Sequence, residues 1–281
     1  MVTIKIALQR ALTKLYSLET AILDAEVLLA YVLNQPRSYL HAWSDATLSE
    51  TDYAKYQELI ERRRQLEPIA YITGQKEFWS LNLAVTKETL IPRPETELLV
   101  EWILKIANND TSKFKCIADL GTGSGAIALA LATEYPNWEI IATDICEKAL
   151  AIASKNAHNL ALTNISFHQG SWCNALPKKE FDLIVSNPPY ISRREWPYYQ
   201  QGLAFEPEGA LLAEEDGLAD IYTIIKSAKS FLKNAGYLLI EHGYQQAEMV
   251  RSQLSLEGYE EISSQQDLRQ HERITIAKFF K

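Results

Sequence analysis

From residue 115 onward, short β-rich runs alternate with longer segments of helical periodicity, and no other feature constrains the possible folds so strongly. Strands are predicted at residues 115–120, 139–143, 164–168, 181–186 and 236–241, and helices at 124–134, 147–160, 218–233 and 244–257. Alternation of this kind favours a parallel sheet covered by helices on both faces. The last two runs, 259–263 and 273–279, indicate a closing antiparallel hairpin.

The first predicted strand runs into a glycine-rich loop, Asp119-Leu120-Gly121-Thr122-Gly123-Ser124-Gly125. Glycines let a backbone approach a ligand closely, and open α/β sheets bind ligands at the carboxyl ends of their strands. The spacing is also compatible with a dinucleotide fingerprint, whose third glycine position would fall on Ala126. The loop therefore predicts a nucleotide-like cofactor that contacts Gly121, Thr122, Gly123, Ser124 and Gly125, without selecting one cofactor.

Two more candidate cofactor contacts follow the next strands. Asp144 ends the second strand, where a carboxylate can accept hydrogen bonds from ribose hydroxyls. It could instead cap the helix that starts near Cys146. Trp172 follows the third strand, where its ring could pack on adenine or lie half-buried in the core.

The fourth strand leads directly into Asn187-Pro188-Pro189-Tyr190, an arrangement suited to holding a planar nitrogen such as an amide or an aminopurine. The side-chain carbonyl of Asn187 can accept one N–H and the backbone carbonyl of Pro188 the other, while Tyr190 offers a flat face. Pro188 and Pro189 fix φ and set these acceptors in advance. An ordinary Asn-Pro turn is the alternative. The tetrapeptide together with the glycine loop points to methyl transfer onto nitrogen from S-adenosylmethionine.

Composition bounds the class of protein. The chain has 281 residues, 47% of them hydrophobic, and a net charge of −8, so we expect a globular protein without stable DNA binding. Its three cysteines, Cys116, Cys146 and Cys173, lack metal-ligand spacing, which favours reduced thiols and no metal. We see no signal-peptide pattern and no membrane span in the sequence, so we expect a cytoplasmic location.

Residues 1–85 are interpreted as a helical N-terminal recognition domain. Ile22, Ala25, Leu29, Val32 and Leu33 recur at helical spacing before Pro36. Ser49-x-x-Asp52 resembles a capping box, with Tyr56, Leu59 and Ile60 on one face of the following helix. Arg62-Arg63-Arg64 is interpreted as a solvated helix face, the alternative being a contact with an acidic partner or RNA.

Residues 86–98 are expected to form a connector to a catalytic domain at 99–281. Pro94 near the first helical position, with Glu95 and Glu97 in the first turn, predicts a helix start that continues through Val100, Ile103 and Leu104. At the far end of the sheet, Glu241-His242-Gly243 follows the fifth strand. For His242 we favour a structural hydrogen bond over catalysis.

With these residues assembled, nearly the whole chain resembles the protein-glutamine methyltransferases of the HemK/PrmC type, which modify peptide chain release factors. The resemblance rests on Tyr71 to Gln75 with Glu77-Phe78-Trp79, Ile91 to Glu97, Asp119 to Gly125, Asn187 to Tyr190, Phe205-Glu206-Pro207 and Glu241-His242-Gly243. Ser171 departs from relatives that carry an acidic residue there, so an adenine contact is not assigned to it.

The resemblance implies an α/β, Rossmann-like class I methyltransferase with a seven-stranded sheet and a small all-α N-terminal domain. It also implies that the glycine loop, Asp144, Trp172 and Asn187 contact S-adenosylmethionine, and that Asn187, Pro188, Pro189 and Tyr190 hold the glutamine of a release factor Gly-Gly-Gln motif. S-adenosylhomocysteine is the expected product. Alternatives are a ribosomal-protein glutamine, an adenine, cytosine or guanine amino group of nucleic acid, or a non-catalytic cofactor-binding module.

Overall fold

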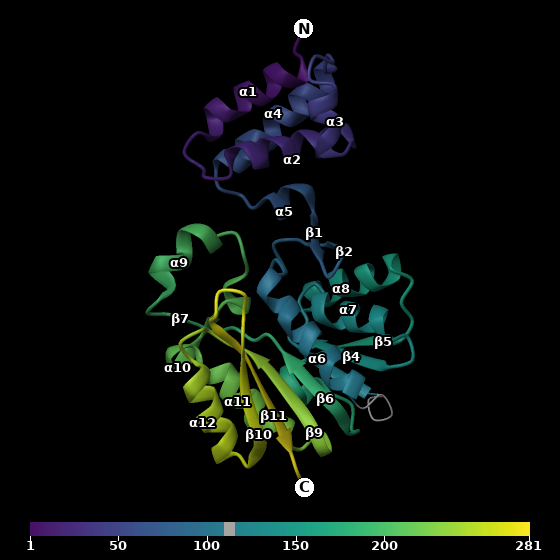
Figure 1. Cartoon of the computed structure of the whole chain (residues 1–281), viewed down its shortest axis with the longest axis vertical. Helices are drawn as coiled ribbons and strands as arrows, with labels where there is room; N and C mark the ends of the chain where they lie inside the picture. The colour runs from purple at the N-terminus through teal and green to yellow at the C-terminus, as the bar shows by residue number, and fades with distance from the viewer. Residues whose placement is uncertain (110–115) are drawn as a thin grey trace. The chain divides into compact units, whose positions relative to one another are not determined.

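The computed structural model describes residues 1–109 and 116–281, which separate into two compact units, Met1–Gln75 and Lys76–Lys281 (Figure 1). Each unit has a hydrophobic core of its own. Lys115, the first residue of the first predicted strand, lies outside the described residues. Within the described residues, no helix is long and apolar enough to cross a membrane.

The first unit is helical, as the sequence predicts. Its helices are α1 (Ile4–Leu15), α2 (Ala21–Leu33), α3 (Arg37–Ala42), α4 (Glu50–Arg64) and α5 (Ile69–Thr73). The Ser49 hydroxyl accepts the Asp52 backbone N–H at 3.0 Å and donates to the Asp52 carboxylate at 2.6 Å, which confirms the predicted cap of α4. The apolar face predicted for α2 is wrong at one position: Ile22 lies in the helix but is 65% exposed, whereas Leu28, which was not assigned to that face, is buried.

A short hairpin, β1 (Gln75–Phe78) and β2 (Leu81–Ala84), contradicts the helical interpretation of residues 75–84. The first strand is largely charged and polar and contains no β-branched residue, so it lacks the alternation typical of a strand. Its two-residue turn places Trp79 and Ser80 at positive φ without the usual glycine. The sequence therefore carries neither of the common hairpin signals here.

The second unit is built on a seven-stranded sheet, which confirms the predicted fold class. Its strands are β3 (Cys116–Leu120), β4 (Glu139–Asp144), β5 (Ile165–Gln169), β6 (Phe181–Ser186), β9 (Leu232–Glu241), β10 (Tyr259–Gln266) and β11 (Glu272–Phe279). The order is β10-β11-β9-β6-β3-β4-β5. The five strands from β9 to β5 are parallel, and β10 and β11 close the sheet as the expected antiparallel pair.

Helices cover both faces of this sheet (Figure 1). They are α6 (Glu97–Asn109), α7 (Ala126–Glu134), α8 (Glu147–Asn159), α11 (Ala219–Ala228) and α12 (Ala247–Leu256). Side chains of successive strand residues pack alternately on the two faces, so Leu183 and Val185 lie with α6 and α7, whereas Ile184 lies with α11 and α12. The central strands are buried on both faces and read as continuous apolar runs for this reason.

Two predicted boundaries in the second unit are corrected. The helix expected at 218–233 ends at Ala228, and β9 begins at Leu232 rather than Gly236. The apolar side chains of Phe231 and Leu232 continue the helical spacing in sequence, but Leu232 pairs with Phe181 in the sheet. Tertiary pairing therefore decides the boundary, not the local pattern.

Residues 187–217, where no element is predicted, form several short ones over the site. They are β7 (Ile191–Ser192), α9 (Trp196–Leu203), the 3-10 turn η3 (Glu208–Ala210), β8 (Leu212–Ala213) and α10 (Glu214–Gly217). Two other 3-10 turns are η1 (Pro94–Thr96) and η2 (Trp172–Ala175). Pro94 starts η1, which leads directly into α6, so the predicted helix start is confirmed with a tighter first turn.

Candidate active site

The site lies at the carboxyl edge of the sheet, beside the point where the strand order reverses. From β3 the chain proceeds to β4 and β5 on one side, and it later returns to β6 and β9 on the other. The glycine loop follows β3 and the Asn-Pro-Pro-Tyr segment follows β6, and these two strands are neighbours in parallel register. This reversal is where open α/β sheets bind their ligands, and it brings both sequence motifs to one crevice edge.

The glycine loop is shaped by backbone conformations that favour glycine. Gly121, Gly123 and Gly125 have φ of +73°, +58° and +89°. The N–H groups of Gly121 and Thr122 both donate to the carbonyl of Thr143 on β4, at 2.9 and 2.8 Å. A Cβ added at Gly123 would meet no heavy atom within 4 Å, so the middle of the loop faces open space. The loop therefore offers backbone to a ligand there.

Asp119 precedes this loop, and its side chain is buried, with 1% of the residue exposed. Its Oδ2 accepts the Thr122 hydroxyl at 2.6 Å and the Ala128 N–H of α7 at 3.2 Å, and Oδ1 has no partner among the described residues. Burial raises the pKa of Asp119 to about 7. Asp119 stands in the motif, but the sequence assigned it no role of its own.

Asp144 connects the loop to the second strand. Its Oδ2 accepts the Gly123 N–H at 2.9 Å, and its Oδ1 accepts the N–H of Cys146, the residue that precedes α8, at 2.8 Å. Burial raises the pKa of Asp144, against the opposing effect of these backbone bonds. The carboxylate thus holds the residue before α8 and lies against the glycine loop, but it does not cap the helix, whose N-cap residue is Cys146, so the capping interpretation is wrong.

The Trp172 ring lies against the first glycine of the loop. A Cβ at Gly121 would come within 3.0 Å of the Trp172 ring, and the indole N–H donates to Asp220 at 3.2 Å. Trp172 has φ of +45°, a strained conformation for a bulky residue and one that clusters at functional sites. The ring is half-buried, as the core interpretation expects, and also borders the loop. Ser171 directly before it is exposed.

The residues around the glycine loop fit an adenosine-containing cofactor. The open backbone at Gly123 and the Asp144 carboxylate lie side by side through their hydrogen bond, and the Trp172 ring packs against Gly121. The described residues include no group of three or more His, Cys, Asp or Glu side chains arranged to hold a metal ion.

Asn187 has a fixed side-chain orientation. Its Nδ2 donates to the hydroxyl of Thr96 at 3.1 Å. Among the described residues no donor occupies Oδ1 of Asn187 or the carbonyl of Pro188. Both residues line a cavity of about 730 Å³. Two acceptors of the kind that the sequence predicts therefore remain available beside this cavity.

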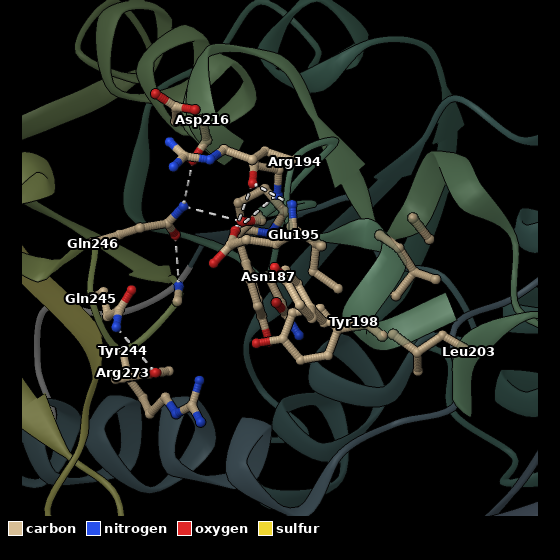
Figure 2. A pocket seen from close by; sticks show the side chains of 18 of the residues that line it. Asn187, Arg194, Glu195, Tyr198, Leu203, Asp216, Tyr244, Gln245, Gln246 and Arg273 are labelled. Carbon is tan, nitrogen blue, oxygen red and sulfur yellow. Dashed lines mark hydrogen bonds between the residues drawn. The ribbon is translucent and has the colours of Figure 1, made fainter. Parts of the chain in front are cut away.

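The cavity is walled by the segments that follow β6 and β9. Figure 2 shows Asn187 among the lining side chains, with Tyr244, Gln246 and Arg273 to one side of it in this view and Tyr198 to the other. The lining also includes Leu90, Arg93, Pro188, Tyr190, Ile191, Arg194 and Tyr199. Aromatic, apolar, basic and acidic groups share this wall, and its acids are Glu195 and Asp216.

Tyr190 is held by groups far away in sequence. Its hydroxyl lies 3.4 Å from Oε1 of Glu241, and burial beside this carboxylate raises its pKa, so the hydroxyl stays protonated. Its backbone carbonyl accepts Nε2 of Gln246 at 3.1 Å. A Cβ at Gly217 would come within 2.2 Å of that same carbonyl oxygen. The backbone after Asn187 is therefore fixed by close packing as well as by proline.

The connector before α6 reaches the same site. Glu206, from the Phe-Glu-Pro motif, accepts the Ile91 backbone N–H at 3.0 Å and forms an ion pair with Arg93. The Glu206 side chain is 2% exposed, so removing Arg93 would leave a buried charge. These contacts hold the connector against the Phe-Glu-Pro segment, although the two segments are far apart in the sequence.

Glu241 is the most informative residue that the sequence did not assign. It ends β9, is 2% exposed, and its Oε2 has no partner among the described residues. Burial raises its pKa to about 7. Thr96 and Gln246 were also not assigned. Two sequence signals pointed to Glu241: its place at the end of a predicted strand, at the edge where ligands bind, and its presence in the Glu241-His242-Gly243 motif.

The remaining candidates have structural partners. His242 is buried, with Nε2 at 2.8 Å from the Thr275 hydroxyl, and burial lowers its pKa to about 4. The structural hydrogen bond expected of His242 is thus present. The arginine cluster of α4 pairs with acids of its own unit: Arg62 with Glu67, Arg63 with Asp24 and Arg64 with Glu61. The interpretation as a solvated helix face fits Arg64, whose side chain is 54% exposed, but is wrong for Arg63, which is 17% exposed and pairs with a buried carboxylate.

Comparison with known proteins decides the family. Residues 7–74 match the family model described as the PrmC N-terminal domain, and residues 112–276 match a methyltransferase domain. The chain is 49% identical over 260 residues to a release factor glutamine methyltransferase from Coxiella burnetii, covering 92% of each chain. The chain belongs to the release factor glutamine methyltransferase family. A relative of the same name from Shewanella oneidensis is 45% identical over 274 residues, covering 97% of this chain and 95% of its own.

Solved structures support the fold of this release factor glutamine methyltransferase family member. The catalytic domain of hMettl16, solved in complex with the MAT2A 3'UTR hairpin 1, matches with a TM-score of 0.59 at 15% identity. The match covers 90% of this chain and 91% of that one. At this identity the likeness concerns the fold alone, and it confirms the class I methyltransferase architecture.

Proposed function

We propose that this chain transfers a methyl group from S-adenosylmethionine to the side-chain amide nitrogen of the glutamine in the Gly-Gly-Gln motif of a peptide chain release factor. Family membership supports the reaction and the class of acceptor. The observation that carries the proposal is the orientation of Asn187. Its amide nitrogen is occupied by Thr96, which leaves its carbonyl oxygen as the group available to an N–H donor beside the cavity.

An amide nitrogen is a poor nucleophile because its lone pair is delocalised into the carbonyl group. In the proposed complex, Oδ1 of Asn187 and the backbone carbonyl of Pro188 each accept one N–H of the glutamine. These two bonds fix the amide plane, and Tyr190 packs against that plane. Orientation of this kind can contribute up to about 7–11 kcal/mol to lowering a barrier, because the entropy of alignment has already been lost.

The groups proposed to hold the cofactor are the glycine loop at 121–125, Asp144, Trp172 and the face of Asn187. When bound, S-adenosylmethionine supplies a methyl group on a sulfonium sulfur, and S-adenosylhomocysteine is the product. The open backbone at Gly123 and the partly buried Asp144 carboxylate suit the cofactor's polar groups. No metal is required in this proposal.

No general base is needed before transfer. As the nitrogen forms its new bond to carbon, it becomes more acidic, and its proton leaves to water afterwards. His242 is unsuited to the role of base, because both ring nitrogens lie within 3.0 Å of groups of the fold, Thr275 and the Gly243 carbonyl. Alignment by Asn187, Pro188 and Tyr190 is thus the chain's main contribution to the chemistry.

Alternative acceptors are a ribosomal-protein glutamine and an amino group of RNA or DNA. The acidic balance of the chain and the internal pairing of its arginine cluster support a protein acceptor. The decisive experiment offers labelled S-adenosylmethionine together with purified release factor, ribosomal proteins, RNA or DNA in separate reactions. Label on the release factor is expected, and label on nucleic acid alone would refute the proposal.

A further inference from the structure

Asn156 is a buried polar residue of α8 that joins two distant segments of the second unit, and it is 2% exposed. Its Oδ1 accepts the backbone N–H of Ala84, in β2, at 2.8 Å. Its Nδ2 donates to the carbonyl of Ala84 at 3.0 Å and to that of Ser124, in the glycine loop, at 2.9 Å. We propose that Asn156 is a positioning residue that holds the glycine loop in the shape that binds the cofactor. This inference rests on the proposed function, in which the loop binds S-adenosylmethionine.

The three bonds fix one orientation of the Asn156 amide. An asparagine side chain has two N–H donors on its nitrogen and one carbonyl acceptor. Both N–H groups of Asn156 are directed to carbonyls, and its oxygen accepts an N–H. The reversed amide would place its oxygen against two carbonyls and its nitrogen against a donor. The surroundings of Asn156 therefore accept an amide in a single orientation, and every bond of that orientation is made within the protein.

The Ser124 carbonyl belongs to the part of the loop that shapes its open backbone. The peptide group between Ser124 and Gly125 is held at both ends, because the Gly125 N–H donates to a carbonyl of the loop at 2.9 Å. On the other side, the Gly123 N–H donates to Asp144. The peptide group between Gly123 and Ser124 has no hydrogen-bond partner among the described residues. Asn156 and Asp144 therefore hold the peptide groups on either side of one that remains available to a ligand.

The other partner of Asn156, strand β2, is a firm support because its hairpin is fixed to two more helices. Trp79, in the turn before β2, donates its backbone N–H to Glu97 of α6 at 2.8 Å. Its indole N–H donates to Glu134 of α7 at 2.6 Å. The hairpin thus supports the loop through Asn156, although it contains none of the residues predicted to contact the cofactor.

The first test replaces Asn156 by alanine in the full chain. Asn156→Ala removes all three bonds without adding a charge, and alanine favours the helical conformation of α8. The dissociation constant of S-adenosylhomocysteine, measured by calorimetry, should rise about tenfold, because the loop loses one of its supports. With release factor as substrate, KM for S-adenosylmethionine should rise by a similar factor. At saturating cofactor kcat should change less than about threefold, because Asn187 and Pro188 remain in place.

The matched control is Asn164→Ala. The Asn164 amide also donates to three backbone carbonyls, at 3.2, 3.2 and 3.1 Å, those of Ala132, Tyr135 and Trp138. Asn164 precedes β5, at the edge of the sheet opposite to the glycine loop. Its loss should lower the free energy of unfolding and leave the affinity for S-adenosylhomocysteine within about twofold. An equal loss of affinity in both variants would attribute the effect to general destabilisation and overturn the inference.

A second measurement needs no variant and keeps the inference falsifiable if Asn156→Ala does not fold. If Asn156 links β2 to the loop, binding of S-adenosylhomocysteine to the unsubstituted chain should stabilise the bonds at Ala84 as well. Amide hydrogen exchange in β2, followed by mass spectrometry, should slow at least about threefold on adding S-adenosylhomocysteine.

Unchanged exchange in β2, or unchanged affinity in folded Asn156→Ala, would overturn the role of Asn156 and leave the proposed function intact. Absence of S-adenosylhomocysteine binding to the unsubstituted chain would overturn the proposed function itself.

Discussion

At the scale of single residues, hydrogen bonds within the protein determine which polar atoms of the site remain available to a ligand. Asn187 donates one amide hydrogen to Thr96, and neither its carbonyl oxygen nor the Pro188 carbonyl has a donor among the described residues. The sequence predicted both acceptors, because a planar NH2 group requires two of them. It did not predict Thr96, because this residue contacts Asn187 only after the fold has brought two distant segments together.

Asn187→Ala should remove most of the turnover, by about 100-fold or more, because one of the two acceptors for the glutamine NH2 is lost. Cofactor affinity should fall much less, since the glycine loop, Asp144 and Trp172 remain. Steady-state kinetics with release factor and calorimetry with S-adenosylhomocysteine measure the two effects. Asn159→Ala, at the exposed end of α8, is the control. Near-normal turnover in Asn187→Ala would refute the role of Asn187.

Glu241→Gln should change stability in a pH-dependent way. Because folding raises the pKa of Glu241 from 4.5 to about 7, the native protein loses stability as pH rises between these values. The variant lacks this loss. Its free energy of unfolding relative to the unsubstituted chain should therefore increase by on the order of 3 kcal/mol across that interval. Denaturant unfolding at a series of pH values measures this, and a pH-independent difference would contradict a buried, titrating carboxyl.

At the scale of elements, the loop that follows β6 is held by close packing against α10. Gly217 has φ of +86°, and a Cβ there would lie 2.2 Å from the carbonyl oxygen of Tyr190. Gln246 donates to the same oxygen from the segment before α12. The position of Tyr190 thus depends on two segments that follow it in the chain and contain none of the predicted catalytic residues.

Gly217→Ala should displace Tyr190 and lower kcat/KM for release factor by at least about tenfold, because both the φ and the contact exclude a side chain. Gly202→Ala is the matched control. Gly202 lies in α9, and its Cβ would meet nothing within 4 Å, so the variant should be neutral or more stable by up to about 1 kcal/mol. Equal activity of the two variants would show that the packing against Tyr190 is unimportant.

In α4, the three adjacent arginines should differ in their contribution to stability. Arg63 pairs with Asp24 at 2.7 Å, with side chains 17% and 8% exposed, whereas Arg64 and Glu61 are 54% and 42% exposed. Arg63→Ala leaves a buried carboxylate and should cost about 3 kcal/mol, and Arg64→Ala less than about 1 kcal/mol. Thermal unfolding of the first unit's helices, followed by circular dichroism, compares them. A larger loss for Arg64→Ala would contradict the pairing.

Features that depend on local sequence could be predicted, whereas features that depend on contacts between distant residues could not. The glycine loop and the strands β3 and β6 were predictable, because glycine conformations and buried apolar runs are local properties. The hairpin of β1 and β2 was not, because its polar strand and glycine-free turn carry no local signal. The early start of β9 was missed for a related reason, since Leu232 joins the sheet through its pairing with Phe181.

At the scale of the whole molecule, five parallel strands and a closing antiparallel pair bring every predicted motif of the second unit to one edge of the sheet. The residues proposed to bind the cofactor follow β3, β4 and β5, and those proposed to bind the substrate follow β6. The connector joins this edge through Glu206 and Thr96. The proposed function places a methyl donor beside an oriented amide at this edge, and family membership supports a release factor as the protein that carries the amide.

The most direct measurement of this account is the position of the transferred methyl group. Release factor incubated with the chain and S-adenosylmethionine is digested and sequenced by tandem mass spectrometry, with a Gln→Ala substitution in the Gly-Gly-Gln motif as the control. We predict a single added methyl on the glutamine side chain and none on the control protein. A methyl group at any other residue, or unchanged methylation of the control, would contradict the central claim.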